Sequence, residues 1–201
     1  AQSTQENATT IEETFDFAAV PAYDGKAYVA VNDNVPFFTE EELSSASYET
    51  YGELDPLGRC TVCVASVGQD LMPPEERGHI GAVKPTGWHT VKYDFVDGKY
   101  LYNRCHLIGY QLTGENANEK NLITGTRYLN IEGMLPFENM VADYVKETDQ
   151  HVMYRVTPVF EGDNLLAAGV LMEGKSVEDN GEGVLFCIFA YNVQPGVSID
   201  Y

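Results

Sequence analysis

The stretch Tyr102–Gly109, Tyr-Asn-Arg-Cys-His-Leu-Ile-Gly, decides how the rest of the chain is interpreted. It follows two β-rich segments within residues 90–102, and the turn between them contains Asp97-Gly98, a dipeptide typical of hairpins. The sequence therefore predicts that His106 lies directly after a hairpin, with Arg104 two residues earlier. A neutral imidazole is a suitable general base near pH 7, and the planar arginine fork binds phosphate oxygens. An Arg-x-His pair alone is common, so it needs support from its surroundings.

The residues that follow supply this support. Residues 103–125 are mostly polar and lack strong periodicity, so we expect a long loop, which in a compact domain is usually functional. The end of this loop runs into the segment Asn121-Leu-Ile-Thr-Gly-Thr-Arg-Tyr-Leu-Asn130. A helix that carries Glu138 is predicted over residues 135–148. Asn130 thus lies just before this helix.

Composition and charge exclude several classes of protein. The chain has 201 residues, of which 44% are hydrophobic and 11% aromatic, which suits one domain with a sizeable core and excludes a disordered chain. No apolar run approaches the roughly 18 residues that span a bilayer. The net charge of −19 argues against a general nucleic-acid coat or a binder of anionic membranes. However, residues 59–127 hold eight basic and seven acidic residues, which is compatible with a local basic cleft or with a chance excess on a solvated face.

The four cysteines do not indicate a metal or redox site. They are too few for a disulfide scaffold, and the pair Cys60 and Cys63 has no second close pair to complete a zinc site. Because this pair falls in a predicted strand, we expect at least two of the four thiols to be buried as small apolar groups. Sequence leaves open whether any of the four, including Cys105 and Cys187, form disulfides.

Local patterns predict an α+β domain with a central antiparallel sheet. Residues 1–20 are expected to be a flexible acidic leader and residues 21–201 a single domain. The N-terminus lacks the basic and apolar parts of a signal segment, so we expect either a mature secreted or cell-surface chain or a cytoplasmic tail. Besides the elements above, we expect a helix start at 39–43 and strands at 28–31, 57–67, 151–160, 164–172 and 184–193.

From Tyr102 to Glu138 the sequence resembles the DNA/RNA non-specific endonuclease family, whose fold is the ββα-metal or His-Me finger, and in particular its bacterial secreted branch. That family carries D-R-G-H or a variant on the second strand of a hairpin, then N-L-x-T-G-T-R-x-x-N and a helix with a glutamate. The resemblance implies a hairpin, long loop and helix built around a hydrated Mg²⁺ ion, for which Mn²⁺ or Ca²⁺ could substitute. It implies hydrolysis of DNA, with RNA left open. The charge and the lack of a long apolar run predict no membrane partner. The oligomeric state stays unknown.

The resemblance also implies roles for individual residues. His106 would activate water, Asn130 would be the direct protein ligand of the metal, and Glu138 would hold metal-bound water. Arg104 and Arg127 would contact the scissile phosphate. Substrate binding would extend to Arg59, Lys120 and Asn121. Asn121, the first residue of the N-L-x-T-G-T-R-x-x-N segment, would also fix the loop.

Two positions depart from the family pattern. Asn103 replaces the usual aspartate, which leaves the tuning of His106 in doubt, and Cys105 replaces glycine, either as an inert buried thiol or as a redox-sensitive one. A competing motif, Glu76-Arg77-Gly78-His79, is closer to D-R-G-H in letters. It lies in a Pro/Gly-rich loop far from Asn130, so we assign the base to His106.

Three functions compete at this stage. The first is a secreted metal-dependent endonuclease. The second is a catalytically lapsed finger domain that serves as a nucleic-acid or protein interaction module. The third, an acidic inhibitor that mimics DNA, is motivated by the charge alone. The complete set of candidate catalytic residues favours the first.

Overall fold

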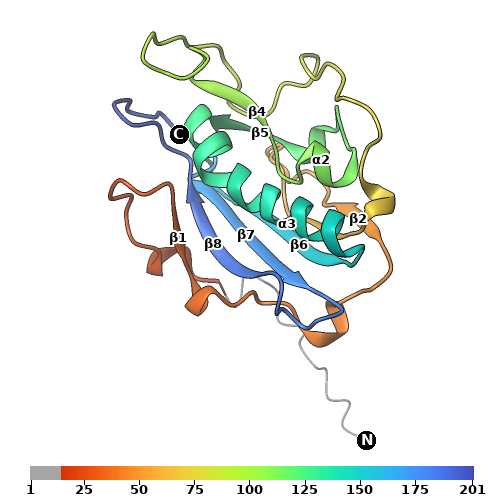
Figure 1. The fold of residues 1–201 in the computed structure, drawn as a ribbon. Helices are drawn as coiled ribbons and strands as arrows, with labels where there is room; N and C mark the ends of the chain where they lie inside the picture. Colours follow the sequence, from red (N-terminus) through yellow and green to blue (C-terminus); the bar gives the residue numbers. More distant parts are fainter. Residues whose placement is uncertain (1–14) are drawn as a thin grey trace, which may run out of the picture.

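A six-stranded antiparallel sheet forms the centre of the molecule (Figure 1). The computed structural model describes residues 15–201. The strand order is β1-β8-β7-β6-β3-β2, and every neighbouring pair is antiparallel. The strands are β1 (Tyr28–Ala30), β2 (Tyr48–Tyr51), β3 (Cys63–Val67), β6 (Val152–Val159), β7 (Gly169–Ser176) and β8 (Leu185–Tyr191). The predicted α+β class with a central antiparallel sheet is confirmed.

Helix α3 (Leu135–Thr148) runs across one face of this sheet (Figure 1). Its bounds agree with the prediction, because Val141 and Val145 recur at helical spacing and both are fully buried. They join one core with residues of the sheet such as Val156 and Met172. The packed core therefore fixes the helix, and with it Glu138, relative to the sheet.

Two further strands form a separate sheet beside the N-terminal end of α3. Strand β4 (Tyr102–His106) pairs with β5 (Leu122–Thr126) in antiparallel register, and His106 lies opposite Leu122. Between them lie a short helix α2 (Tyr110–Thr113) and a 3-10 turn η5 (Glu119–Asn121). The order β4, β5, α3 gives the expected two strands and a helix.

The prediction that a hairpin within residues 90–102 leads into the His106 motif was wrong, because the strand that carries the motif pairs with β5 instead. The arms of the predicted hairpin make one isolated bridge, between Lys92 and Tyr100, although the turn at Gly98 and Lys99 has the positive φ values of a tight hairpin turn. His106 instead ends the first strand of the pair, and its partner strand comes 15 residues later, after residues 107–121. The loop expected at residues 103–125 therefore contains most of β4 and most of β5.

Several other boundaries also differ from the prediction. The helix start at 39–43 is a 3-10 turn, η3 (Glu40–Glu42), closed by a capping box between Thr39 and Glu42. The strand expected at 164–172 begins at Gly169, because the backbone N–H groups of Leu165 and Leu166 donate to the Tyr201 carbonyl instead of a strand. Of the leader expected over residues 1–20, residues 1–14 lie outside the described residues, while Phe15 and Phe17 pack against Phe189.

The burial of the cysteines agrees with the prediction from the sequence. All four thiols are free and buried, and burial raises the pKa of Cys60 to about 11 and that of Cys63 to about 12. Cys105 is fully enclosed and its pKa is also raised, which fits an inert thiol. No helix within residues 15–201 combines the length and the apolar composition that a bilayer span requires.

Candidate active site

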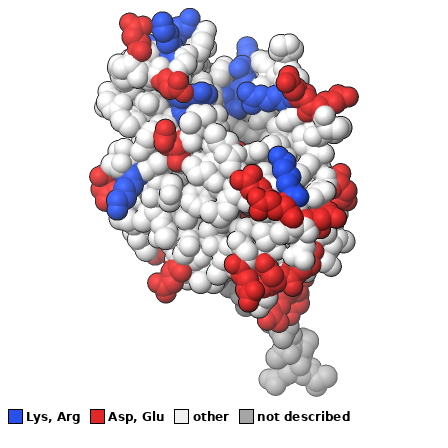
Figure 2. Space-filling model, viewed as in Figure 1, with Lys and Arg blue, Asp and Glu red and all other residues white. Residues whose placement is uncertain are grey.

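A hollow of about 300 Å³ lies where β4, the residues after β5 and the start of α3 meet. It brings together five of the residues predicted from sequence: Arg104, His106, Arg127, Asn130 and Glu138. In Figure 2, most of the Lys and Arg side chains on the viewed face lie toward the top, among some acidic ones, while the lower end is acidic. The upper part of this view contains β4 and β5 (Figure 1). Three cations, Arg77, Arg104 and Arg127, line the hollow itself.

His106 is held with a defined donor and acceptor. Its Nε2 lies 2.9 Å from the backbone oxygen of Asn116. Because a carbonyl oxygen only accepts, Nε2 donates, and in the neutral ring Nδ1 keeps the lone pair. Burial of the ring lowers the pKa of His106, and the positive charge of Arg77 lowers it further, while the bond to Asn116 acts in the opposite direction. The ring is therefore neutral at pH 7 and able to accept a proton.

Asn130 lies in a π-helical turn, η6 (Leu129–Met134), that leads into α3. The N–H of Leu135 donates to the Asn130 carbonyl, five residues back. In a uniform α-helix, eight residues would leave Glu138 about 80° away from the direction of Asn130. The wider π turn rotates less per residue and removes most of this offset, so both side chains line one hollow.

The side-chain amide of Asn130 is oriented by Asn103. Nδ2 of Asn130 donates to Oδ1 of Asn103 at 3.2 Å, and Nη1 of Arg127 donates to the same oxygen at 3.3 Å. Oδ1 of Asn130 accepts no hydrogen bond from residues 15–201. The departure from the family aspartate at position 103 thus keeps the acceptor and removes its charge.

Glu138 is buried and makes no ion pair or hydrogen bond within residues 15–201. Its relative exposure is 7%, and burial raises its pKa to about 8. Gly109 makes room for it, because a Cβ there would lie 3.0 Å from Cδ and from Oε2 of Glu138. A buried carboxyl group without a partner costs stability, which is typical of a functional group.

The two predicted phosphate-binding arginines are both fixed by neighbours. Arg104 donates to the carbonyls of Gly81 and Val83, and its guanidinium lies 3.9 Å from the centre of the Trp88 ring. Arg127 donates through Nε and Nη2 to one oxygen of Asp97, at 3.1 and 3.0 Å. The flat guanidinium groups are thereby held at the hollow before any substrate arrives.

Arg77 also lines this hollow, although it was not predicted from sequence to be a site residue. It lines two adjoining hollows as well, and it makes no ion pair with residues 15–201. The competing motif around it does not supply the base, since His79 is exposed and does not line the hollow. The available signal was the arginine of the competing motif in this Pro/Gly-rich loop.

Three predicted substrate contacts do not lie at this site. Asn121 is fully buried and exchanges two hydrogen bonds with the backbone of Ile108, so it fixes the loop but cannot reach a substrate. Lys120 pairs with Glu53 at 2.8 Å, away from the hollow. Arg59 pairs with Asp55 at 2.7 Å. The prediction that these three bind substrate is not supported by where they lie.

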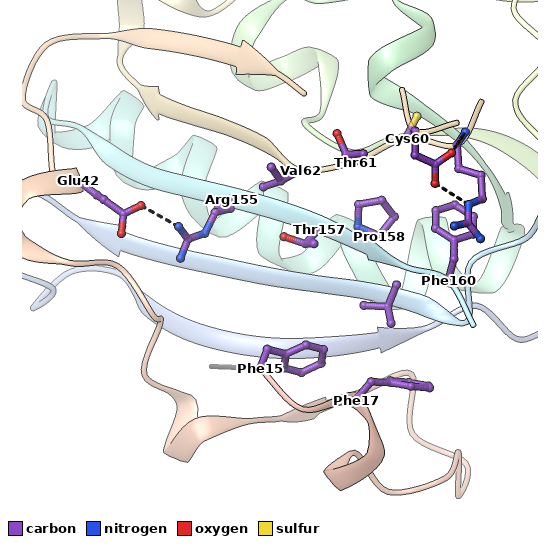
Figure 3. Close-up of a pocket in the computed structure, with 13 residues that line it drawn as sticks. Phe15, Phe17, Glu42, Cys60, Thr61, Val62, Arg155, Thr157, Pro158 and Phe160 are labelled. Atoms are coloured by element: carbon purple, nitrogen blue, oxygen red, sulfur yellow. Dashed lines mark hydrogen bonds and ion pairs between the residues drawn. The ribbon is translucent and has the colours of Figure 1, made fainter. Parts of the chain in front are cut away.

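Arg59 lines a larger cavity, of about 630 Å³, elsewhere on the molecule. Figure 3 shows this cavity beside the central strands, with Phe15 and Phe17 on one side and the pair Glu42–Arg155 at one end. Its arginines are already paired, because Arg155 also forms two bonds with the buried carboxylate of Glu173. Cavity size therefore does not identify the reactive site here.

A Ser-His-Glu arrangement elsewhere also needs to be distinguished from a catalytic triad. His151 lies 3.0 Å from Ser47 and 2.9 Å from Glu178. The Ser47 hydroxyl donates its one proton to Asp70 and not to His151, so this serine is not arranged for deprotonation by the imidazole. The network therefore fits the structural role predicted for His151.

The hollow also fits a hard, hydrated cation. Asn130 offers a free amide oxygen, and Glu138 offers a carboxyl group without a partner, while residues 15–201 contain no group of three His, Cys, Asp or Glu side chains that could hold a metal. Mg²⁺ prefers oxygen ligands and keeps several waters, so it needs few ligands from the protein. These residues suit Mg²⁺ better than a structural zinc ion.

Comparisons with known proteins match the family that the motif resembles. The model of the DNA/RNA non-specific endonuclease family matches residues 40–178. A curated deoxyribonuclease of Streptococcus dysgalactiae subsp. equisimilis is 32% identical over 108 residues, and the match covers 51% of this chain and 32% of that protein. The chain thus matches about a third of that relative's length.

Solved structures share the fold. NucA from Streptococcus agalactiae with a magnesium ion bound has a TM-score of 0.75 at 24% identity, covering 86% of this chain and 82% of that one. Sda1 nuclease with a bound zinc ion has a TM-score of 0.73 at 23% identity, covering 88% and 94%.

Proposed function

Because the chain belongs to the DNA/RNA non-specific endonuclease family, we propose that it hydrolyses phosphodiester bonds of DNA with a magnesium ion held at Asn130. The observation that carries this proposal is the single hollow that joins His106, Asn130 and Glu138 to the arginines. Since these cations contact phosphate rather than bases, cleavage is independent of sequence and the proposal includes RNA strands.

Each residue of the hollow has a task in this reaction. His106, fixed by Asn116, takes a proton from a water molecule at Nδ1, and that water attacks phosphorus. Arg77, Arg104 and Arg127 bind the phosphate oxygens and hold the strand in place.

The metal would be held by few protein atoms. Oδ1 of Asn130 would bind Mg²⁺ directly, and Glu138 would orient water of its hydration shell. When bound, Mg²⁺ supplies positive charge that neutralises the charge developing on the phosphate and on the leaving 3′ oxygen. Mn²⁺ or Ca²⁺ are candidates to replace it. The zinc ion of Sda1 makes zinc a fourth metal to test.

We also propose that the protein acts outside the cell. Two structural neighbours support this: one is described as an extracellular endonuclease, with a TM-score of 0.62, and one as an extracellular nuclease, with a TM-score of 0.57. Export would bring the enzyme to free nucleic acid.

A plasmid-nicking assay with Mg²⁺, and with EDTA, tests the enzyme against a lapsed finger domain. His106→Ala should lower the cleavage rate at least about 100-fold, the usual scale for a general base. Its circular dichroism spectrum should stay unchanged. His79→Ala is the matched control and should cut like the parent. Binding without cleavage by the parent protein would favour the interaction module, and loss of activity in His79→Ala alone would move the base to His79.

A further inference from the structure

A second hollow of about 470 Å³ adjoins the candidate active site and has a different chemistry. It shares Arg77, Arg104, Arg127 and Asn130 with the site, so the two hollows are continuous. Its remaining wall is largely aromatic, with Trp88, Tyr100 and Tyr102. A substrate phosphate at the arginines would therefore have an aromatic chamber on one side.

The aromatic side chains differ in how much surface they offer. Tyr102 is buried, with its ring 4.9 Å from His89, and serves as the floor. Tyr100 is 46% exposed, and the ammonium of Lys92 lies 4.8 Å from its ring centre. The guanidinium of Arg104 lies over the ring of Trp88, 3.9 Å from the ring centre. Flat, partly exposed surfaces next to cations are the combination that binds single-stranded nucleic acid.

A third hollow also adjoins the active site, and it has a different composition. It is lined by Glu75, Glu76 and Lys146 among others, and it contacts the active site through Arg77, Tyr110 and Gln111. Its two carboxylates balance its two cations, and Tyr110 is its one aromatic residue, whereas the second hollow has three arginines, three aromatic rings and no carboxylate in its lining. The second hollow is therefore the better match to a phosphate and its base.

We propose that the chamber of Trp88 and Tyr100 binds one unpaired nucleobase of the substrate strand, next to the phosphate that is cut. This inference rests on the proposed nuclease function and adds a substrate class to it. A base in a Watson–Crick pair cannot enter a separate chamber without leaving its partner, so the enzyme should prefer single-stranded or locally opened nucleic acid. Any base has a flat face, so the chamber confers no strong sequence preference.

Cleavage of a single-stranded oligonucleotide that contains one abasic residue tests this chamber. In the parent enzyme, one of the two phosphates that flank the abasic residue should be cut about tenfold more slowly than the same phosphate in the intact strand, the usual scale for one lost stacking contact. In Tyr100→Ala this penalty should disappear, and in Tyr100→Phe it should persist. Phe95→Ala removes a ring that is 64% exposed and does not line the chamber, so it should keep the parent's penalty.

Two outcomes of this assay would contradict the base-binding role of the chamber. One is a parent enzyme that cuts normally and is not slowed beside the abasic residue. The other is a Tyr100→Ala enzyme that is slowed as much as the parent. A parent enzyme that cuts no strand at all would instead contradict the proposed nuclease function. The two failures are therefore distinguishable.

Fluorescence provides a measurement that does not need cleavage. Trp88 is the chain's single tryptophan, so its emission reports on this chamber alone. A short oligothymidylate added to the His106→Ala protein should quench the emission, and a sugar–phosphate strand of the same length without bases should not. Equal quenching by both strands would mean that the phosphates alone perturb Trp88, and the base-binding role would be rejected.

Discussion

Asn103 and Asn130 are joined by a hydrogen bond of 3.2 Å in which the metal-ligand candidate is the donor. Since an amide has one oxygen and one NH2 group, this bond determines which end of Asn130 is left for a cation. Asn103 is therefore a positioning residue, although sequence comparison marks it as a departure from the family pattern.

Replacing Asn103 by alanine should weaken Mg²⁺ binding by about 10- to 100-fold, the range seen when an outer partner of a metal ligand is removed. Asn103→Asp keeps the acceptor and should retain binding. Calorimetric titration of Mg²⁺ into each folded variant checks this. Equal affinities of the parent and the alanine variant would mean that Asn103 does not orient the ligand.

The buried state of His106 predicts where the acid limb of the pH–rate profile falls. Burial and Arg77 lower its pKa below the ordinary 6.5, so the ring stays neutral as the pH falls through 6.5, and the rate should decline only at lower pH. Arg77→Met removes a repelling charge and should move the limb to higher pH. The profile of kcat/KM at saturating Mg²⁺ measures this, and a limb that does not move would exclude Arg77 as a cause.

Asp97 competes with substrate for Arg127. Its carboxylate is 75% exposed and accepts from two nitrogens of Arg127, the same groups that a phosphate would use. Asp97→Asn should raise the affinity of the His106→Ala protein for a single-stranded oligonucleotide by up to about fivefold, since exposed pairs contribute at most about 1 kcal/mol.

Asp94→Asn makes the same change of net charge on the same loop and is the control for Asp97→Asn. Filter binding at fixed salt compares the two. Equal gains would assign the effect to overall charge rather than to Arg127.

Glu138 should make the metal-free protein less stable as the pH rises. Its folded pKa of about 8 exceeds the ordinary 4.5, so the folded state holds a proton that the unfolded state releases between these values. Stability is thus lost from about pH 4.5 to about pH 8. Glu138→Gln lacks this loss, and its melting temperature in EDTA should exceed the parent's increasingly toward pH 8. A constant difference across this range would contradict the linkage.

The far side of the sheet contains a buried ion pair whose removal should lower the stability strongly. Glu173 is fully buried and makes two bonds with Arg155, at 2.9 and 3.0 Å. Glu173→Ala should cost about 3–5 kcal/mol, because it leaves the buried guanidinium of Arg155 with only its more exposed partner, Glu42. Glu42, the outer partner of Arg155, is 42% exposed, and Glu42→Ala should cost less than about 1 kcal/mol. Urea unfolding compares the two variants.

Sequence reasoning succeeded where the pattern was local. The helix from Leu135 to Thr148 has a clear 3.6-residue period, and the site motif was carried by spacing along one segment. The pairing of β4 with β5 is not local, and the turn at Asp97-Gly98 offered a nearer but weaker partner. Arg77 was missed because only the folded chain brings its loop to the hollow. Asn121 was assigned to substrate because burial cannot be inferred from a polar side chain in a polar segment.

The π turn at Leu129–Met134 holds one residue more than an α-helical turn would. If one residue between Asn130 and Glu138 were lost and the segment became uniform α-helix, the two side chains would be seven residues apart, about 20° around the helix axis. The same site could therefore be built with seven residues in a plain helix or with eight residues and a π turn. A one-residue gap at this point in an alignment of related genes is thus compatible with an intact metal site.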